Sequence, residues 1–292
     1  TSPAYWDTSK EPTQSQHELF QRFDTFGPEE YAELANHCKL VGIDFLSTPF
    51  DLDAVDYLTP LMPVTKVASA DLTNIPLIRK IAKTGNPVVM SVGASSHQEI
   101  DRSVGEVLDG GAPSLTLLHC VLNYPTPRQN AHLSQIEVLI EKYSDRVSIG
   151  YSDHVRPEDD GSLPALEIAA IKGARVIEKH FTDNKAGVGN DHYHAMDESD
   201  LKAFTQKLAV YAQLFGDGKL HLEDQTAAIS NARRRVIATK DLPSGHVISE
   251  SDLIALRSNI GIEIFEWDRV VGARLARPVA QDQPISWEDL SS

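Results

Sequence analysis

The sequence predicts an α/β fold, a (β/α) barrel followed by a small second unit. Short β-rich apolar runs alternate with helical patterns, and their starts are spaced by about 20–30 residues. Polar side chains recur where these runs end, which is where barrel enzymes collect their active-site residues. After Gly216 this alternation stops, which predicts the second unit.

Six runs are expected to form strands. Several are apolar at consecutive positions, as in parallel strands that are covered on both faces. The runs are residues 43–48, 64–69, 87–93, 114–121, 146–152 and 174–181. A (β/α)₈ barrel needs eight strands, so the chain shows two fewer than the complete fold. An open dinucleotide-binding sheet has no support, because no G-x-G-x-x-G follows a run.

Helices are expected between the strands and after the last one. Asn74 and Ser96 are candidate N-caps, and glycines end several of the helices. The expected helices are 28–42, 74–85, 97–111, 133–143, 163–173 and 198–216. The glycines are Gly42, Gly85, Gly110 and Gly173.

The chain is divided into three parts by this pattern. Residues 1–216 form the barrel, 217–234 are polar without a strand signal and predict a linker, and 235–292 form the small unit. In the small unit, Ser249 and Asp252 have the spacing of a capping box that opens one helical turn. The rest of it is short and β-like.

Composition limits the partners. The 292 residues hold 42 Asp and Glu against 27 Lys and Arg, a formal net charge of −15. This disfavours nucleic acid and an anionic membrane as partners, since both attract a basic face. No apolar run approaches the ~20 residues that span a bilayer. With only Cys38 and Cys120 present, a reducing, cytoplasmic setting is expected.

Two histidines follow neighbouring predicted strands. Ser152 and His154 share a face, as do Glu178 and His180, because residues i and i+2 of a strand point the same way. Two imidazoles flanked by oxygen groups can hold a divalent cation and leave positions open for water and substrate. Structural roles for both histidines remain the alternative. Asp153 faces away from its neighbours, which argues against a serine hydrolase triad.

Lys66 also lies at a strand end, where a buried ammonium needs an anion. Hydroxyl groups on this and other strands could complete a cradle for phosphate and carboxylate, with ordinary polarity of the barrel rim as the alternative. These hydroxyls belong to Thr48, Ser69, Ser91 and Ser152.

The polar loop 187–197 follows the last predicted strand. His192 and His194 could form a second metal pair, but covering the site or simple solvation is the favoured interpretation. Asp191 could accept hydrogen bonds from a sugar hydroxyl. Cys120 is expected to be a buried structural thiol.

Five strand-end motifs resemble those of the sialic acid synthase family, which makes N-acetylneuraminate and related nonulosonates. They are FLSTPFD (45–51), KVASAD (66–71), LLHC…YPTP (117–127), IGYSDH (149–154) and IEKHFT (177–182). The C-terminal LPSGHVISESDL…VVGARLARPVAQDQPI is similar to that family's antifreeze-like (SAF, β-clip) domain. The resemblance implies a TIM barrel with this domain appended.

It also implies a transferase that condenses phosphoenolpyruvate with an N-acylated hexosamine such as N-acetylmannosamine. The sugar aldehyde accepts C3 of phosphoenolpyruvate, water adds at C2, and phosphate leaves, giving a nine-carbon α-keto acid. A divalent cation, Mn²⁺ or Mg²⁺, polarises the aldehyde and orients the water.

Residue roles follow from the motif match. His154 and His180 correspond to metal ligands, and Tyr124 and Asp191 to groups near the sugar. Arg257 corresponds to an arginine that reaches the partner subunit's barrel, which implies a domain-swapped homodimer. The groups that correspond to the phosphoenolpyruvate site are Lys66, Thr48, Ser69, Ser91 and Ser152.

Two departures from the family bear on activity. About sixty residues at the start, including the strand with the family's proposed general-base Glu, have no counterpart here, so the 292-residue chain alone is expected to be inactive. Leu122 stands where N-acetylneuraminate synthases often carry Asn, which leaves a diacetamido trideoxyhexose, giving a legionaminate- or pseudaminate-type acid, as an alternative.

Two other functions are alternatives to the synthase. A non-catalytic binding protein on a truncated barrel is one. A phosphoenolpyruvate aldol enzyme of the keto-deoxy-octulosonate phosphate type is the other, but such enzymes lack the antifreeze-like domain.

Overall fold

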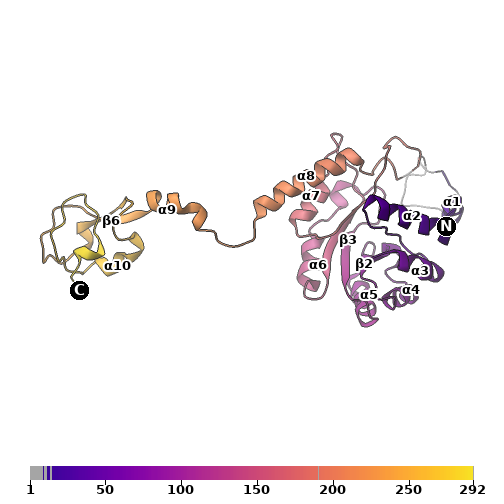
Figure 1. The fold of residues 1–292 in the computed structure, drawn as a ribbon, viewed down its shortest axis with the longest axis horizontal. Coiled ribbons are helices and arrows are strands. Elements are labelled where there is room, and N and C mark those ends of the chain that lie inside the picture. The colour runs from indigo at the N-terminus through magenta and orange to yellow at the C-terminus, as the bar shows by residue number, and fades with distance from the viewer. Residues whose placement is uncertain (1–8, 10–11, 14, 190, 292) are drawn as a thin grey trace. The chain divides into compact units, whose positions relative to one another are not determined.

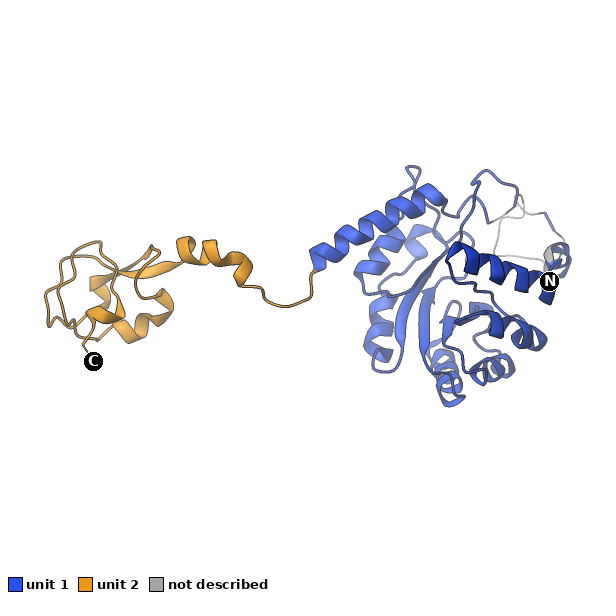
Figure 2. Ribbon diagram, viewed as in Figure 1, with its two compact units in different colours: residues 1–215 blue, residues 216–292 orange. Residues whose placement is uncertain are grey.

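The computed structural model describes residue 9 and residues 12–13, 15–189 and 191–291. The chain separates into two compact units, residues 1–215 and 216–292 (Figure 2). Each unit has its own hydrophobic core, so each is described by itself.

Unit 1 alternates strands and helices along the chain (Figure 1). Its strands are β1 (Thr65–Val67), β2 (Val88–Ser91), β3 (Leu115–Cys120), β4 (Ser148–Asp153) and β5 (Ile177–Lys179). Its helices are α1 (Gln16–Phe23), α2 (Pro28–Val41), α3 (Leu52–Leu58), α4 (Ile75–Ala82), α5 (His97–Asp109), α6 (Gln135–Tyr143), α7 (Pro164–Ile171) and α8 (Glu198–Phe215). This is the βα alternation that the sequence predicts.

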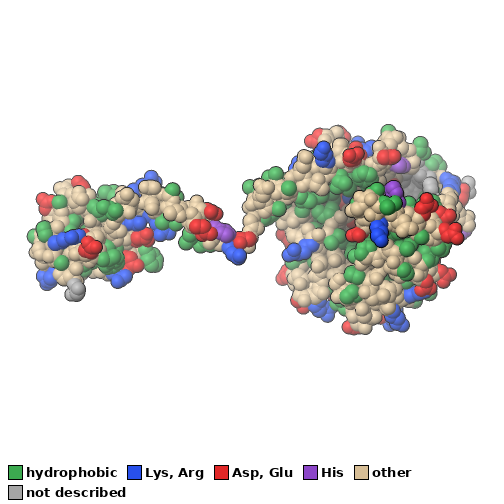
Figure 3. All heavy atoms as spheres, in the orientation of Figure 1, with side chains coloured by type: hydrophobic (Ala, Val, Ile, Leu, Met, Phe, Trp, Pro, Cys, Tyr) green, Lys and Arg blue, Asp and Glu red, His purple; other side chains and the backbone are tan. Residues whose placement is uncertain are grey.

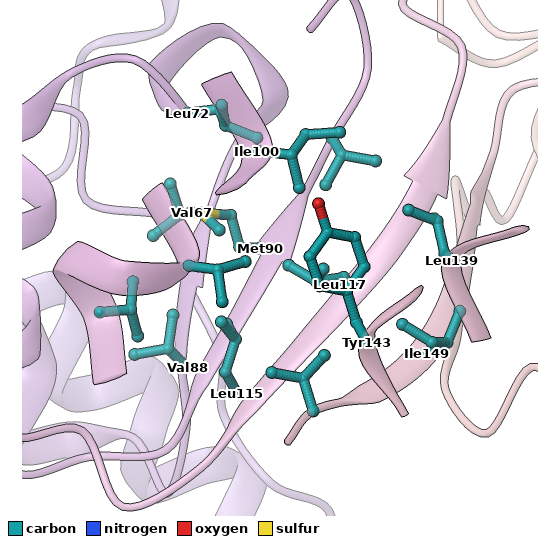
Figure 4. Packing of buried hydrophobic residues seen from close by; sticks show 14 of the residues in the cluster. Val67, Leu72, Val88, Met90, Ile100, Leu115, Leu117, Leu139, Tyr143 and Ile149 are labelled. Carbon is teal, nitrogen blue, oxygen red and sulfur yellow. The ribbon is translucent and has the colours of Figure 1, made fainter. Parts of the chain in front are cut away.

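All five strands form one parallel sheet in the order β1-β2-β3-β4-β5. Consecutive strands are therefore neighbours, and each connection runs through a helix, as in a barrel. Alternate strand residues such as Val88, Met90, Leu115 and Leu117 are buried in the core shared with these helices (Figure 4). The other strand residues, which alternate with these, point to the inner face of the sheet, where the candidate site lies.

The prediction of a first strand at 43–48 is wrong, because this segment has no strand structure. The Ile43 N–H instead continues the end of α2 by donating to the Cys38 carbonyl oxygen (3.0 Å). Among the described residues no ladder joins 43–48 to β1, and Ile43 and Leu46 are exposed. An apolar run becomes a strand only where a neighbour supplies hydrogen bonds. The other five predicted strands are confirmed, with β5 shorter than 174–181.

The six predicted helices are confirmed, and local chemistry accounts for where they begin and end. The Asn74 and Ser96 side chains accept from the N–H groups of Leu77 and Glu99, which caps α4 and α5. Gly42 ends α2 in the left-handed conformation (φ 81°), where a side chain would be strained.

Unit 2 is built around an antiparallel pair, β6 (Arg234–Ala238) and β7 (Leu253–Arg257). The expected capping box is confirmed, since the Ser249 and Asp252 groups bond reciprocally around a single turn at 250–252. Helix α10 (Trp267–Val270) follows. The predicted linker 217–234 is not free of regular structure, because helix α9 (Thr226–Ala232) lies within it.

No helix among the described residues has the length and apolar character needed to cross a membrane. On the face drawn in Figure 3, acidic side chains are spread over unit 1 among exposed hydrophobic ones. This agrees with the excess of Asp and Glu over Lys and Arg, 42 against 27.

Candidate active site

The candidate site lies at the carboxyl ends of β1, β4 and β5, on the inner face of the sheet. Ser152 and Glu178 are partners in the β4–β5 register. His154 lies two residues after Ser152, and His180 lies two residues after Glu178. Two residues along a strand span about 6–7 Å on one face. A polar group deeper in the barrel and an imidazole group nearer its rim are therefore neighbours.

The imidazole group combines His180 with two residues of the loop after β5. One ligand atom each of His180, Asp191 and His194 lies within 4.8 Å of the others. A single Asp191 carboxylate oxygen, Oδ1, is 3.7 Å from His180 Nδ1 and 3.6 Å from His194 Nε2. We call these three residues the His–Asp–His cluster.

His154 stands beside this cluster. Its ring centroid is 5.2 Å from that of His180, and the two planes are nearly perpendicular at 87°. The Tyr124 ring lies 4.1 Å from His154 and 5.7 Å from His180. The His154 Nδ1 is 2.9 Å from the Val121 carbonyl oxygen, which can only accept, so Nδ1 carries the proton and Nε2 keeps a lone pair.

Burial sets the protonation of this region. It lowers the pKa of His180 to about 4, with the Asp191 charge opposing the shift and the other imidazoles adding to it. Burial also lowers the pKa of His154. Interaction with His194, together with the other imidazoles, lowers the pKa of Asp191. These shifts favour a neutral imidazole at His154 and His180 and an ionised Asp191 carboxylate at neutral pH, the forms that bind metal ions.

The residues fit a divalent cation. The His194 side chain is fully buried, and neither ring nitrogen has a hydrogen-bond partner among the described residues. Leaving such groups unpaired costs about 1–3 kcal/mol each, which a ligand would relieve. Nitrogen and carboxylate donors in this combination suit Mn²⁺, Mg²⁺ or Zn²⁺ more than soft metals.

The deeper group contains Lys66, Ser152 and Glu178. The Lys66 Nζ is 3.5 Å from Glu178 Oε2, and the Ser152 hydroxyl donates to Glu178 Oε1 at 2.7 Å. Nearby on β2, the buried Ser91 hydroxyl has no hydrogen-bond partner in the part of the chain that the structure describes. The Ser69 hydroxyl accepts from the Gly93 N–H (3.0 Å). An ammonium and hydroxyls are groups that can donate hydrogen bonds to an oxyanion.

Most residues predicted from the sequence lie on unit 1 and at strand ends. Thr48 lies in the segment that precedes α3 and is half-buried there. Arg257 ends β7 in unit 2 and is exposed, so its predicted role at a partner's barrel stays a prediction. Asp191, predicted to contact the sugar, is brought into the His–Asp–His cluster.

Two residues were missed or undervalued by sequence reasoning. The sequence favours a covering role for His194, but in the structure it is the buried member of the cluster. His192 lies outside the cluster and forms a hydrogen bond with the Thr182 hydroxyl (2.7 Å). A loop has no periodicity from which to choose between them. From the sequence, Glu178 is expected only as an oxygen group beside His180. Its spacing of two residues from His180 already placed both side chains on one strand face.

Comparison with known proteins matches this architecture. Residues 1–220 match the NeuB family and residues 233–291 the SAF domain. The chain is 32% identical over 276 residues to N,N'-diacetyllegionaminic acid synthase of Campylobacter jejuni, covering 93% of this chain and 80% of that protein.

Two crystal structures are also similar. A protein named for spore coat polysaccharide biosynthesis (protein E), from Chromobacterium violaceum, is 28% identical with a TM-score of 0.81, covering 98% of this chain and 85% of that one. N-acetylneuraminic acid (sialic acid) synthetase from Leptospira borgpetersenii, in complex with citrate, is 29% identical with a TM-score of 0.66, covering 76% and 78%. These matches confirm the predicted barrel with an antifreeze-like domain, and the chain belongs to the NeuB family.

Proposed function

We propose that this protein is a phosphoenolpyruvate-dependent nonulosonate synthase, a transferase that joins phosphoenolpyruvate to an N-acylated hexosamine such as N-acetylmannosamine. The observation that carries the proposal is the grouping of cation ligands with a lysine and serine hydroxyls on one inner face of the sheet, among which the Ser91 hydroxyl has no partner in the described residues. The relatives of the chain are sialic, legionaminic and pseudaminic acid synthases, which agrees with that reaction class.

The His–Asp–His cluster and His154 would hold Mn²⁺ or Mg²⁺. The bound cation would supply Lewis-acid polarisation of the sugar aldehyde and an orienting charge for water. The protein contributes to this by keeping His154 and His180 neutral through burial and by fixing the His154 proton on Nδ1, where Val121 accepts it.

Lys66 and the hydroxyls of the deeper group would bind the phosphate and carboxylate of phosphoenolpyruvate. In the reaction, C3 of phosphoenolpyruvate bonds to the aldehyde carbon and a water oxygen bonds to C2. The bond between C2 and the phosphate oxygen then breaks, so that phosphate leaves with that oxygen and C2 becomes the keto carbon. Of the two protons of the water, one ends on the former aldehyde oxygen and one on the phosphate. The Lys66 ammonium offsets the charge that remains on the phosphate. The hydroxyls in this role are those of Thr48, Ser69, Ser91 and Ser152.

Tyr124 and Asp191 lie on the rim side of the site, where the sugar would enter. We further propose that Arg257 reaches the sugar's acyl group from the second unit of a partner, in a domain-swapped homodimer of the cytoplasm. A legionaminate-type reaction on a diacetamido trideoxyhexose is the second candidate. It is favoured by Leu122 and by the 32% identity to a legionaminic acid synthase.

Calorimetry tests the proposal directly. Phosphoenolpyruvate and Mn²⁺ should each bind the protein. Lys66→Ala should weaken the binding of phosphoenolpyruvate, and His154→Ala should weaken the binding of Mn²⁺. With the complete natural protein, a panel of N-acyl hexosamines should yield an α-keto acid and phosphate in equal amounts. Binding without turnover on any sugar would favour a non-catalytic binding protein, and no binding of either ligand would overturn the proposal.

A further inference from the structure

Behind the imidazoles, on the opposite face of the sheet, lies a buried ion pair. Asp153 and Lys179 are direct partners in the β4–β5 register, and their side chains approach to 2.8 Å between Oδ2 and Nζ. Both are almost completely buried, at 2% and 1% side-chain exposure. Neither touches the inner face, because each lies between two inward-pointing residues.

The pair is part of a larger hydrogen-bonded group. The other Asp153 oxygen, Oδ1, accepts from the Tyr151 hydroxyl at 2.7 Å and from the Val155 N–H at 2.9 Å. Lys179 also donates to the Val155 carbonyl oxygen. Both backbone groups of Val155 are therefore held by the ion pair, and the Asp153 carboxylate contacts partners through both of its oxygens.

This arrangement holds the backbone on both sides of His154. Asp153 precedes His154 and Val155 follows it, and Lys179 directly precedes His180. The β4–β5 ladder ends at Asp153 and Lys179, so His154 and His180 do not pair with each other. Their carbonyl oxygens instead accept from the N–H groups of Thr126 (2.8 Å) and Met196 (2.9 Å). These bonds fix one side of each backbone, and the ion pair adds contacts to both backbone groups of Val155, directly after His154.

Stability alone is a weak explanation for such a pair. Removing two charges from water costs several kcal/mol per ion, and a well-packed apolar pair is often as stable or more so. Groups behind metal ligands commonly orient them, and their loss typically costs 10–100-fold in metal affinity or activity.

We propose that Asp153 and Lys179 are positioning residues, which set the orientation and tautomer of His154 and the placement of His180 through the backbone that they hold. The metal-binding consequence rests on the proposed function. The effect on the imidazoles does not, because it is a property of the metal-free protein.

The test uses Lys179→Met and the double variant Asp153→Asn/Lys179→Met. Lys179→Met should lose thermal stability, because it leaves the buried Asp153 carboxylate without a cation. The double variant removes both charges, so it should recover that stability. Ile149→Val is the matched control, because it loosens the core on β4 without touching the ion pair.

The first readout is the ¹⁵N spectrum of the histidine rings in the metal-free proteins, assigned with His154→Gln. The unaltered protein and Ile149→Val should show His154 with its proton on Nδ1 alone. Both ion-pair variants should show a mixture of tautomers. A single unchanged tautomer in both variants would overturn the proposal, whatever their melting temperatures.

The second readout is Mn²⁺ affinity by calorimetry. We expect both ion-pair variants to bind at least tenfold more weakly than the unaltered protein, and the double variant to stay weak although its melting temperature recovers. Affinity that recovers together with stability would mean that the pair is only structural. If the unaltered protein binds no Mn²⁺, the proposed function fails, and the ¹⁵N spectra still decide the positioning role.

Discussion

The Lys66 ammonium on β1 lies 3.5 Å from the Glu178 carboxylate on β5. These strands are at opposite ends of the sheet order, with β2, β3 and β4 between them. Neighbouring strands are about 4.8 Å apart, so in a flat sheet β1 and β5 would be separated by roughly 19 Å. The contact is made because the sheet curls around its inner face. Curvature is therefore what assembles a lysine from one end with a carboxylate and an imidazole from the other.

Replacing Lys66 by Met should weaken phosphoenolpyruvate binding. A hydrogen bond to a charged group contributes about 1.5–3 kcal/mol, which corresponds to roughly 10- to 150-fold in affinity. Calorimetric titration measures this. Lys80→Met is the control, because Lys80 pairs with Asp56 on the surface (2.7 Å) and is remote from the inner face. Equal losses in both variants would mean that general charge, and not the site, attracts the ligand.

His194→Leu should weaken Mn²⁺ binding by at least tenfold, since a ligand is lost. The metal-free variant should keep or gain thermal stability, because two buried, unpartnered nitrogens are removed. His192→Leu, from the same loop, should leave Mn²⁺ affinity near that of the unaltered protein. The interpretation of the cluster fails if His192→Leu has the larger effect on affinity.

Two buried serines should respond in opposite ways to replacement by alanine. The Ser103 hydroxyl donates to the Leu72 carbonyl oxygen at 2.6 Å, so Ser103→Ala should cost about 1 kcal/mol of stability and leave phosphoenolpyruvate binding intact. The Ser91 hydroxyl has no hydrogen-bond partner within the described ranges of the chain. Ser91→Ala should therefore change stability little but weaken phosphoenolpyruvate binding. Denaturant unfolding and calorimetry together check both halves, and a large loss of stability in Ser91→Ala would contradict the assignment.

The metal-free protein should lose stability as the pH falls from 6.5 towards 4. The pKa of His180 is lowered from its ordinary value of 6.5 to about 4, so between these values the unfolded chain binds a proton that the folded chain does not. The free energy of unfolding then rises with pH across this window. Denaturant titrations of the unaltered protein and of His180→Gln measure it, and the variant should show the shallower slope. Identical slopes would mean that other groups account for the acid sensitivity.

Much of unit 1 could be predicted from local patterns. Apolar runs such as 114–121 became strands, and the side chains of Asn74 and Ser96 cap helices as their positions predict. The alternation of strand residues also placed Ser152 with His154, and Glu178 with His180, on one face. These are short-range consequences of backbone geometry, so the sequence carries them directly.

Residues 43–48 show where this reasoning stops, since an apolar run has no strand structure without a neighbour to bond to. The sequence by itself determined which side chains share a strand face and which segments form helices, because both follow from periods of two and 3.6 residues. Only the tertiary structure decided that His194 and not His192 joins His180 and Asp191, and that Lys66 meets Glu178. Those contacts depend on loop conformation and on the curvature of the whole sheet, to which residues far apart in the chain contribute.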